Sequence, residues 1–127
     1  MIRELWPLLL VRDVDESSHF YTSKLGFEVA GRAESEDGVY WCRLKRDGAS
    51  FMLQQRAKDR DYLDSPAPNV TFYFVCDDAD KLYTEFSAKG LSLSPPSLAY
   101  YGMKQLFVPD PDGYVVCFET PTETWSG

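Results

Sequence analysis

The sequence is short of histidine, cysteine and basic residues, and it has no long apolar run. Its 127 residues include one histidine and three cysteines, and 13 lysines and arginines stand against 20 aspartates and glutamates, a net charge of −7. A nucleic-acid-binding protein needs a basic face, so this charge argues against a nucleic-acid partner. No run approaches the roughly 20 apolar residues of a membrane span, and the first residues lack the cleavage site of a signal peptide. We therefore expect a soluble, cytoplasmic protein without a membrane partner.

The three cysteines, Cys42, Cys76 and Cys117, are widely spaced, and each lies in an apolar run. Their odd number and the absence of a C-x-x-C pair argue against a disulfide scaffold or a structural zinc site. We expect buried free thiols in strands, in keeping with a reducing compartment. With 44% hydrophobic residues, 127 residues fit a single domain, residues 1–127, that builds its own core.

Apolar runs and turn signals predict the same order of elements twice. The first half contains an expected strand at 5–11, a helix at 14–25 and strands at 27–32, 39–45 and 50–55. The second half contains an expected strand at 69–76, a helix opened by Asp77, Asp78 and Asp80, and strands near 91–93 and at 103–108 and 114–119. The polar segment 56–68 between the halves is expected to be a linker or loop.

The two halves repeat at an offset of 64 residues. Val11-x-Asp13 leads through the first helix to Gly26, and Val75-x-Asp77 leads through the second helix to Gly90. Asp13 and Glu16 have the spacing of a capping box, which marks the start of the first helix. Two copies are too few for a solenoid. They predict two βαβββ modules, at about 1–58 and 66–123.

Both halves resemble one known family. The segment LLLVRDVDESSHFYTSKLGFEV resembles the opening of vicinal-oxygen-chelate proteins, the superfamily of glyoxalase I, the bleomycin-resistance proteins and the extradiol dioxygenases. The segments VCDDADKLYTEFSAKG and YYGMKQLFVPDPDGYVVCFE fit its second half, with Tyr101-Gly102-Met103 followed by Asp110 to Gly113 and Glu119. The resemblance is closest to the bleomycin-resistance-like single-domain members. It implies an α+β fold in which two βαβββ modules form a curled mixed sheet around a cavity, in a homodimer that is swapped or unswapped.

In the metal-dependent members, the resemblance implies, four strand side chains converge on one divalent ion. By position these fall at Trp6, Gln54, Thr71 (or Val70) and Glu119. Only Glu119 is a proper ligand, because Trp and Val cannot ligate and Thr and Gln are weak. The one histidine, His19, lies in the first expected helix, so neither a two-His-one-carboxylate iron site nor a His-containing zinc site can form. We expect no cofactor, while a weak divalent-ion site at Glu119 and Gln54 stays open.

The alternation of side chains along strands predicts which residues line the implied cavity. The expected lining is Trp6, Leu8, Met52, Gln54, Met103, Gln105 and Glu119, with Trp41 and Arg43, or else Tyr40 and Cys42, from the third strand, and Tyr100 and Tyr101 at the mouth. Aromatic walls with few polar groups are typical of small-molecule pockets. Core packing of these aromatic residues, and an ion pair between Glu119 and Arg43, remain open alternatives.

These patterns favour a small-molecule-binding protein, similar to the bleomycin-resistance proteins, that sequesters an aromatic or cationic ligand without a metal and thereby confers antibiotic resistance. No Ser-His-Asp or Cys-His arrangement is available for nucleophilic catalysis, because the one histidine is already placed in a helix. An alternative is a divalent-metal-dependent lyase, isomerase or dioxygenase, for which Glu119 is the support, so whether the chain is an enzyme stays open. A third hypothesis is an interaction module without a ligand.

Overall fold

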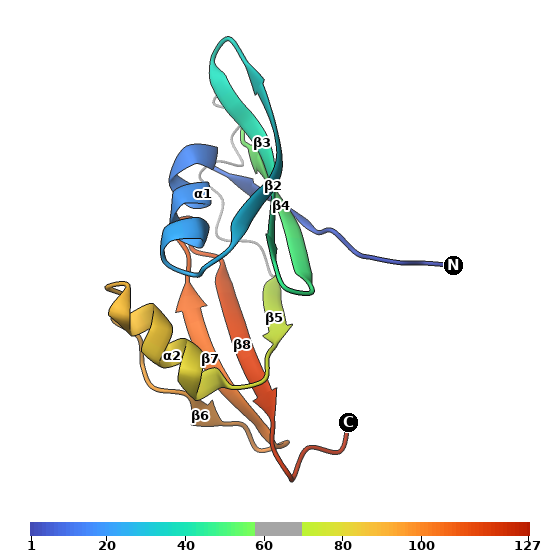
Figure 1. The fold of residues 1–127 in the computed structure, drawn as a ribbon, viewed down its shortest axis with the longest axis vertical. Helices are drawn as coiled ribbons and strands as arrows, with labels where there is room; N and C mark the ends of the chain where they lie inside the picture. The colour runs from blue at the N-terminus through green and yellow to red at the C-terminus, as the bar shows by residue number, and fades with distance from the viewer. Residues whose placement is uncertain (58–69) are drawn as a thin grey trace. The chain divides into compact units, whose positions relative to one another are not determined.

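The computed structural model describes residues 1–57 and 70–127, which form two compact units, the first within Met1–Ala67 and the second within Pro68–Gly127. Each unit contains a strand, a helix and three further strands, as the repeat predicts (Figure 1). Most of the expected linker at 56–68 lies outside the described residues. The expected α+β class with two βαβββ modules is confirmed, with one four-stranded sheet in each module.

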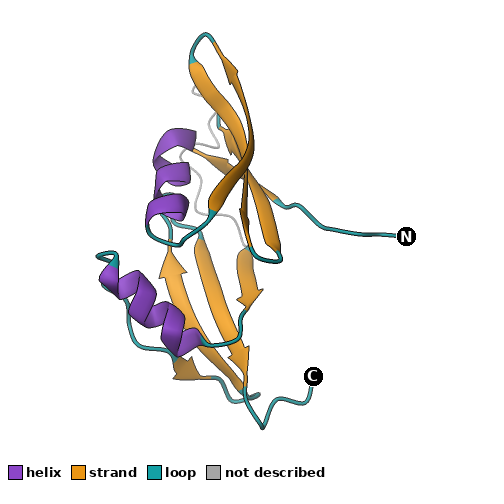
Figure 2. Ribbon diagram, viewed as in Figure 1, coloured by secondary structure: helices purple, strands orange, loops and turns teal. Residues whose placement is uncertain are grey.

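The first unit is a mixed sheet with one helix on one face (Figure 2). Its elements are β1 (Leu8–Val11), α1 (Val14–Ser23), β2 (Glu28–Ser35), β3 (Gly38–Arg46) and β4 (Ala49–Gln55). The strand order is β1-β4-β3-β2, in which β1 runs parallel to β4 and the other pairs are antiparallel. The helix covers an aromatic cluster, where Tyr21 packs edge-on against Phe27 and Phe51. Edge-to-face contacts of this kind stabilise a core beyond the area they bury.

The second unit repeats this arrangement. Its elements are β5 (Thr71–Val75), α2 (Ala79–Ala88), β6 (Ser97–Leu98), β7 (Met103–Pro109) and β8 (Val115–Pro121). The strand order is β5-β8-β7-β6, with β5 parallel to β8. Phe86 of α2 packs against Phe118 of β8, which in turn stacks on Phe74. One face of this sheet is therefore covered by α2, and the side chains that alternate with Phe118 project from the other face.

Aspartate caps begin both helices. The Asp13 side chain accepts a hydrogen bond from the Glu16 backbone N–H at 3.1 Å, as its spacing predicts, and Asp78 accepts one from Lys81 at 3.1 Å. The cap of the second helix is thus Asp78, 65 residues after Asp13, and the expected pairing of Asp13 with Asp77 is wrong by one residue. Among the described residues, no helix is long and apolar enough to cross a membrane.

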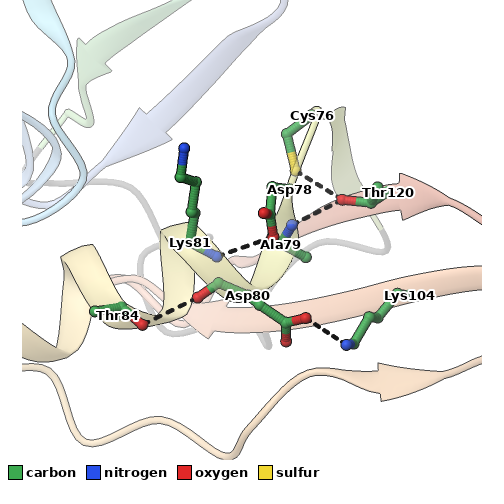
Figure 3. A network of polar contacts seen from close by, with 8 residues as sticks. All are labelled: Cys76, Asp78, Ala79, Asp80, Lys81, Thr84, Lys104 and Thr120. Atoms are coloured by element: carbon green, nitrogen blue, oxygen red, sulfur yellow. Dashed lines mark hydrogen bonds and ion pairs between the residues drawn. The ribbon is translucent and has the colours of Figure 1, made fainter.

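A side chain from the last strand of each unit also holds the helix start. Gln55 of β4 accepts from the Val14 backbone N–H at 3.1 Å, and Thr120 of β8 accepts from Ala79 at 2.8 Å (Figure 3). The two acceptors lie 65 residues apart, like the helix starts that they bind. Lys104 of β7 and Asp80 form an ion pair that ties the first turn of α2 to the sheet (Figure 3).

The expected strand near 91–93 is wrong, and the corresponding strand is β6 at Ser97–Leu98. Gly90 has φ +97°, and the backbone N–H groups of Gly90 and Leu91 donate to Ser87 and Phe86. This is the Schellman ending of α2, which leaves the Leu91 N–H committed to the helix. In the first unit, the corresponding bond to Tyr21 comes from Phe27, one residue later than the repeat with Leu91 requires. That extra residue explains why the glycines repeat at 64 and the helix caps at 65.

Candidate functional site

The helix-free face of the second unit is built from alternate residues of three strands. The register pairs Glu119 of β8 with Val75 and Gln105, and Cys117 with Tyr73 and Phe107. Directly paired residues project from the same side of a sheet. Tyr73, Val75 and Phe107 are exposed by 51%, 67% and 43%, so this face presents apolar and aromatic surface to solvent.

A row of three polar side chains crosses this face. The Gln105 amide nitrogen donates to Glu119 Oε1 at 2.9 Å and to the Tyr101 hydroxyl at 2.6 Å. Gln105 and Glu119 are each 8% exposed, whereas Tyr101 is 37% exposed. Within the described part of the second unit, no lysine or arginine forms an ion pair with the Glu119 carboxylate. A buried charge without an ion-pair partner is costly, so this carboxylate favours a cation that approaches it.

Tyr101 is held by the C-terminal segment. The carbonyl of Gly102 accepts from the Thr122 backbone N–H at 2.9 Å and from its hydroxyl at 2.6 Å. The turn that follows places the Trp125 ring edge-on to Tyr101, with centroids 5.7 Å apart, and Tyr100 packs edge-on at 5.1 Å. Tyr101 is therefore the middle ring of an aromatic group at the end of the polar row.

The helix-free face of the first unit carries a second group of candidate residues. The Arg43 guanidinium lies 4.1 Å from the centroid of the Trp6 ring and donates to Ser50 at 3.0 Å. A groove of about 450 Å³ lies beside Trp6 and Met52 and is also lined by Arg3 and Glu4. Because Arg43 stacks on Trp6 and bonds Ser50, it is fixed at one edge of this groove.

The register of β3 decides between the two alternatives for the third strand. Trp41 pairs with Gln54, and Arg43 pairs with Met52, so these four side chains share the helix-free face with Leu8, which also pairs with Met52. Cys42 is 2% exposed and lies on the opposite face, within the core. The alternative of Tyr40 and Cys42 is therefore wrong.

A family comparison agrees with this architecture. The model of the Glyoxalase/Bleomycin resistance protein/Dioxygenase superfamily matches residues 5–118, nearly the whole chain. The chain belongs to this superfamily. The resemblance that the sequence motifs carry is thus confirmed. No curated protein matches the chain in sequence.

Solved structures of this superfamily share the fold at low sequence identity. A bleomycin resistance determinant encoded on the transposon Tn5 is 22% identical, with a TM-score of 0.76 over 96% of this chain and 99% of that chain. A bleomycin-binding protein complexed with bleomycin is 22% identical, with a TM-score of 0.74 over 94% and 98%. A glyoxalase-related enzyme from Clostridium phytofermentans is 16% identical, with a TM-score of 0.76 over 95% and 96%. Proteins that bind and a protein related to an enzyme therefore share this fold.

The four positions that ligate metal in some superfamily members do not fit a metal ion in this chain. Trp6 offers an indole ring, which is engaged by Arg43, and Thr71 offers a hydroxyl on an exposed strand. Glu119 is bonded to Gln105, and Gln54 is an exposed amide. Among residues 1–57 and 70–127, no three His, Cys, Asp or Glu side chains are grouped closely enough to hold a metal ion.

The structure brings the expected site residues together in two groups, one in each unit. The first contains Trp6, Leu8, Trp41, Arg43, Met52 and Gln54, and the second contains Tyr101, Met103, Gln105 and Glu119. Met103 is 4% exposed and belongs to the core as much as to the face. Ligand binding by all of these residues stays a prediction.

Three aromatic residues of the second face were not anticipated. Tyr73 and Phe107 could have been found by applying the alternation rule to the strands at 69–76 and 103–108, since each shares the parity of a candidate residue. Trp125 lies beyond the expected end of the second module at 123, and no periodicity points to it. Its position depends on the turn at Thr122 and Gly102.

Cys117 should make the stability of the protein depend on alkaline pH. Burial, and then the negative charge of Glu119, raise the pKa of this thiol from 9.0 to about 12. Above about pH 9 the unfolded chain loses this proton while the folded chain keeps it, so the free energy of unfolding falls by about 1.4 kcal/mol per pH unit from this group until about pH 12.

Cys117→Val removes this contribution while keeping an apolar side chain. Urea denaturation between about pH 9 and pH 11 should therefore show a shallower decline for Cys117→Val than for the wild type. Cys42, whose pKa burial also raises, is present in both proteins and cancels in the comparison. Equal slopes for the two proteins would contradict the prediction.

Proposed function

We propose that this chain is a metal-free small-molecule-binding protein that sequesters an aromatic or cationic ligand on the helix-free face of its second unit. The observation that carries the proposal is the Glu119 carboxylate, nine-tenths buried, with no ion-pair partner in the described part of that unit. The exposed rings of Tyr73, Phe107 and Tyr101 belong to the same face or lie at its end.

Two physical effects favour a flat cation at such a place. Aromatic faces attract a cation through their negative quadrupole, by about 0.5–2 kcal/mol depending on desolvation. A carboxylate in low dielectric interacts with a cation more strongly than one in water. The net charge of −7 adds a weak long-range attraction for the same sign of ligand.

The similarity to bleomycin-binding and bleomycin-resistance structures is compatible with this proposal. The alternative, a divalent-metal-dependent lyase, isomerase or dioxygenase, depends on Glu119 as its one good ligand. The poor fit of Trp6, Gln54 and Thr71 to a metal ion favours binding without metal. A homodimer and a cytoplasmic location, expected from the resemblance and the composition, remain part of the proposal.

A charge series on one tricyclic ring system tests the ligand class. We expect cationic 9-aminoacridine to bind more tightly than neutral acridine, and 9-anthracenecarboxylate to bind least, because the ring surface is nearly constant and the charge changes. Isothermal titration calorimetry measures the three affinities. Binding of none of the three, or tightest binding of the anion, would refute the proposal.

Elemental analysis of protein purified without chelators tests the metal-free part separately. We expect no transition metal at stoichiometric amount. One transition metal ion per chain would support the metal-dependent enzyme instead.

A further inference from the structure

The Gln105 amide determines which groups of the polar row remain available to a ligand. Its nitrogen donates to both Glu119 and the Tyr101 hydroxyl, and an amide NH₂ has two hydrogens, so both are used. The ionised Glu119 carboxylate can only accept, which fixes the amide with its nitrogen toward that side chain. At 8% exposure, Gln105 cannot exchange these bonds for water without moving the strand.

The two neighbours of Gln105 are left with opposite hydrogen-bonding capacity. Because the Tyr101 oxygen accepts from Gln105, its own O–H proton must point elsewhere, and no acceptor for it is recorded among the described residues. Glu119 keeps lone pairs on its second oxygen, which can accept but cannot donate. The row therefore offers one donor, at Tyr101, and one charged acceptor, at Glu119.

The donor and the acceptor are close together. Tyr101 Oη and Glu119 Oε1 are both bonded to the same nitrogen, at 2.6 and 2.9 Å, so their separation is less than two hydrogen-bond lengths. A ligand that satisfies both must carry its own donor and acceptor on neighbouring atoms. A protonated amine one carbon away from a carbonyl meets this requirement.

Resting on the proposed function, we propose that the row of Glu119, Gln105 and Tyr101 selects aromatic cations that carry a hydrogen-bond acceptor next to the cationic nitrogen, with Gln105 as the positioning residue. The cationic N–H donates to Glu119, and the adjacent acceptor receives the Tyr101 hydroxyl proton. An aromatic cation without this acceptor leaves the Tyr101 donor unused and forgoes one hydrogen bond.

Two amines that differ in one group test the selection. L-phenylalaninamide and 2-phenylethylamine share a phenyl ring and an ammonium group, and the first adds a carboxamide beside the ammonium. One additional hydrogen bond contributes about 0.5–1.5 kcal/mol, so we expect the wild type to bind L-phenylalaninamide roughly threefold to tenfold more tightly. Calorimetric titration of each amine gives the ratio of the two dissociation constants.

Tyr101→Phe removes the donor and keeps the ring, and Gln105→Met removes the amide that orients both neighbours. We expect the ratio to fall to about one in both variants. Tyr83→Phe, on α2, is the matched control and should keep the wild-type ratio, because it removes a hydroxyl from the opposite side of the same unit. A loss of folding alone would not change the ratio between two amines for the protein that remains folded.

The outcomes separate this inference from the proposed function. A wild-type ratio near one, or a ratio that persists in Tyr101→Phe, would overturn the selection while binding of either amine still supports the proposed function. Binding of 9-aminoacridine without binding of either amine would also overturn the selection and leave the proposed function standing. Failure of every aromatic cation would refute both.

Discussion

Glu119→Gln is expected to weaken the binding of 9-aminoacridine by roughly tenfold to a hundredfold. A hydrogen bond to a charged group contributes about 1.5–3 kcal/mol, more than one between neutral groups, and the substitution removes the charge from the one buried acid of β8. The glutamine side chain has the same length and offers a carbonyl oxygen to Gln105, so the sheet should stay intact. Calorimetric titration at low salt, with circular dichroism as the check on folding, measures the effect.

The control for this variant is Glu123→Gln, which changes the net charge by the same amount. Glu123 is exposed and lies after β8, so its charge is screened by solvent. We expect its affinity for 9-aminoacridine to stay within about twofold of the wild type. If the two variants bound equally, the interaction would be one of overall charge, and Glu119 would lose its assigned role.

Gly102→Ala is expected to lower the free energy of unfolding by about 2–4 kcal/mol, because it combines backbone strain with overpacking. Gly102 has φ +99°, a conformation that residues with a Cβ rarely adopt. A Cβ there would lie 2.6 Å from the Trp125 backbone nitrogen and 2.7 Å from the Thr124 carbonyl carbon. Neither atom belongs to a flexible side chain, so the C-terminal segment would have to move.

The same movement should also disturb the candidate site. The turn at Thr122 is bonded to the Gly102 carbonyl and places Trp125 against Tyr101. We therefore expect Gly102→Ala to alter the tryptophan fluorescence of the folded protein and to reduce the discrimination between L-phenylalaninamide and 2-phenylethylamine. Urea denaturation and the two titrations measure these effects.

Gly31→Ala is the matched control on a strand. A Cβ at Gly31 would meet the Trp41 ring at 3.7 Å, which is ordinary van der Waals contact. We expect a change in the free energy of unfolding of less than about 1 kcal/mol, because alanine restricts the unfolded chain more than glycine does. Equal destabilisation by the two substitutions would show that the tight C-terminal packing is not what Gly102 provides.

Local signals in the sequence were sufficient for most of the elements. Asp13 with Glu16 marked the first helix, and Asp47-Gly48 marked a hairpin that the structure places between β3 and β4. These signals work because caps and turns satisfy backbone groups within a few residues. The error at 91–93 has the same origin, since an apolar residue after Gly90 can close a helix or begin a strand, and the Schellman bonds decided for the helix.

By itself, the sequence determined the two-module α+β fold, the superfamily, and the candidate positions on the strands, because all of these follow from periodicity and from motifs that are local in the chain. The tertiary structure alone decided that Trp41 and Arg43, and not Tyr40 and Cys42, share a face with Met52. It also decided that Gln105 bonds both Tyr101 and Glu119, and that Trp125 packs on Tyr101. Strand register and the path of the C-terminal segment depend on pairing between residues far apart in sequence, and no local pattern records that pairing.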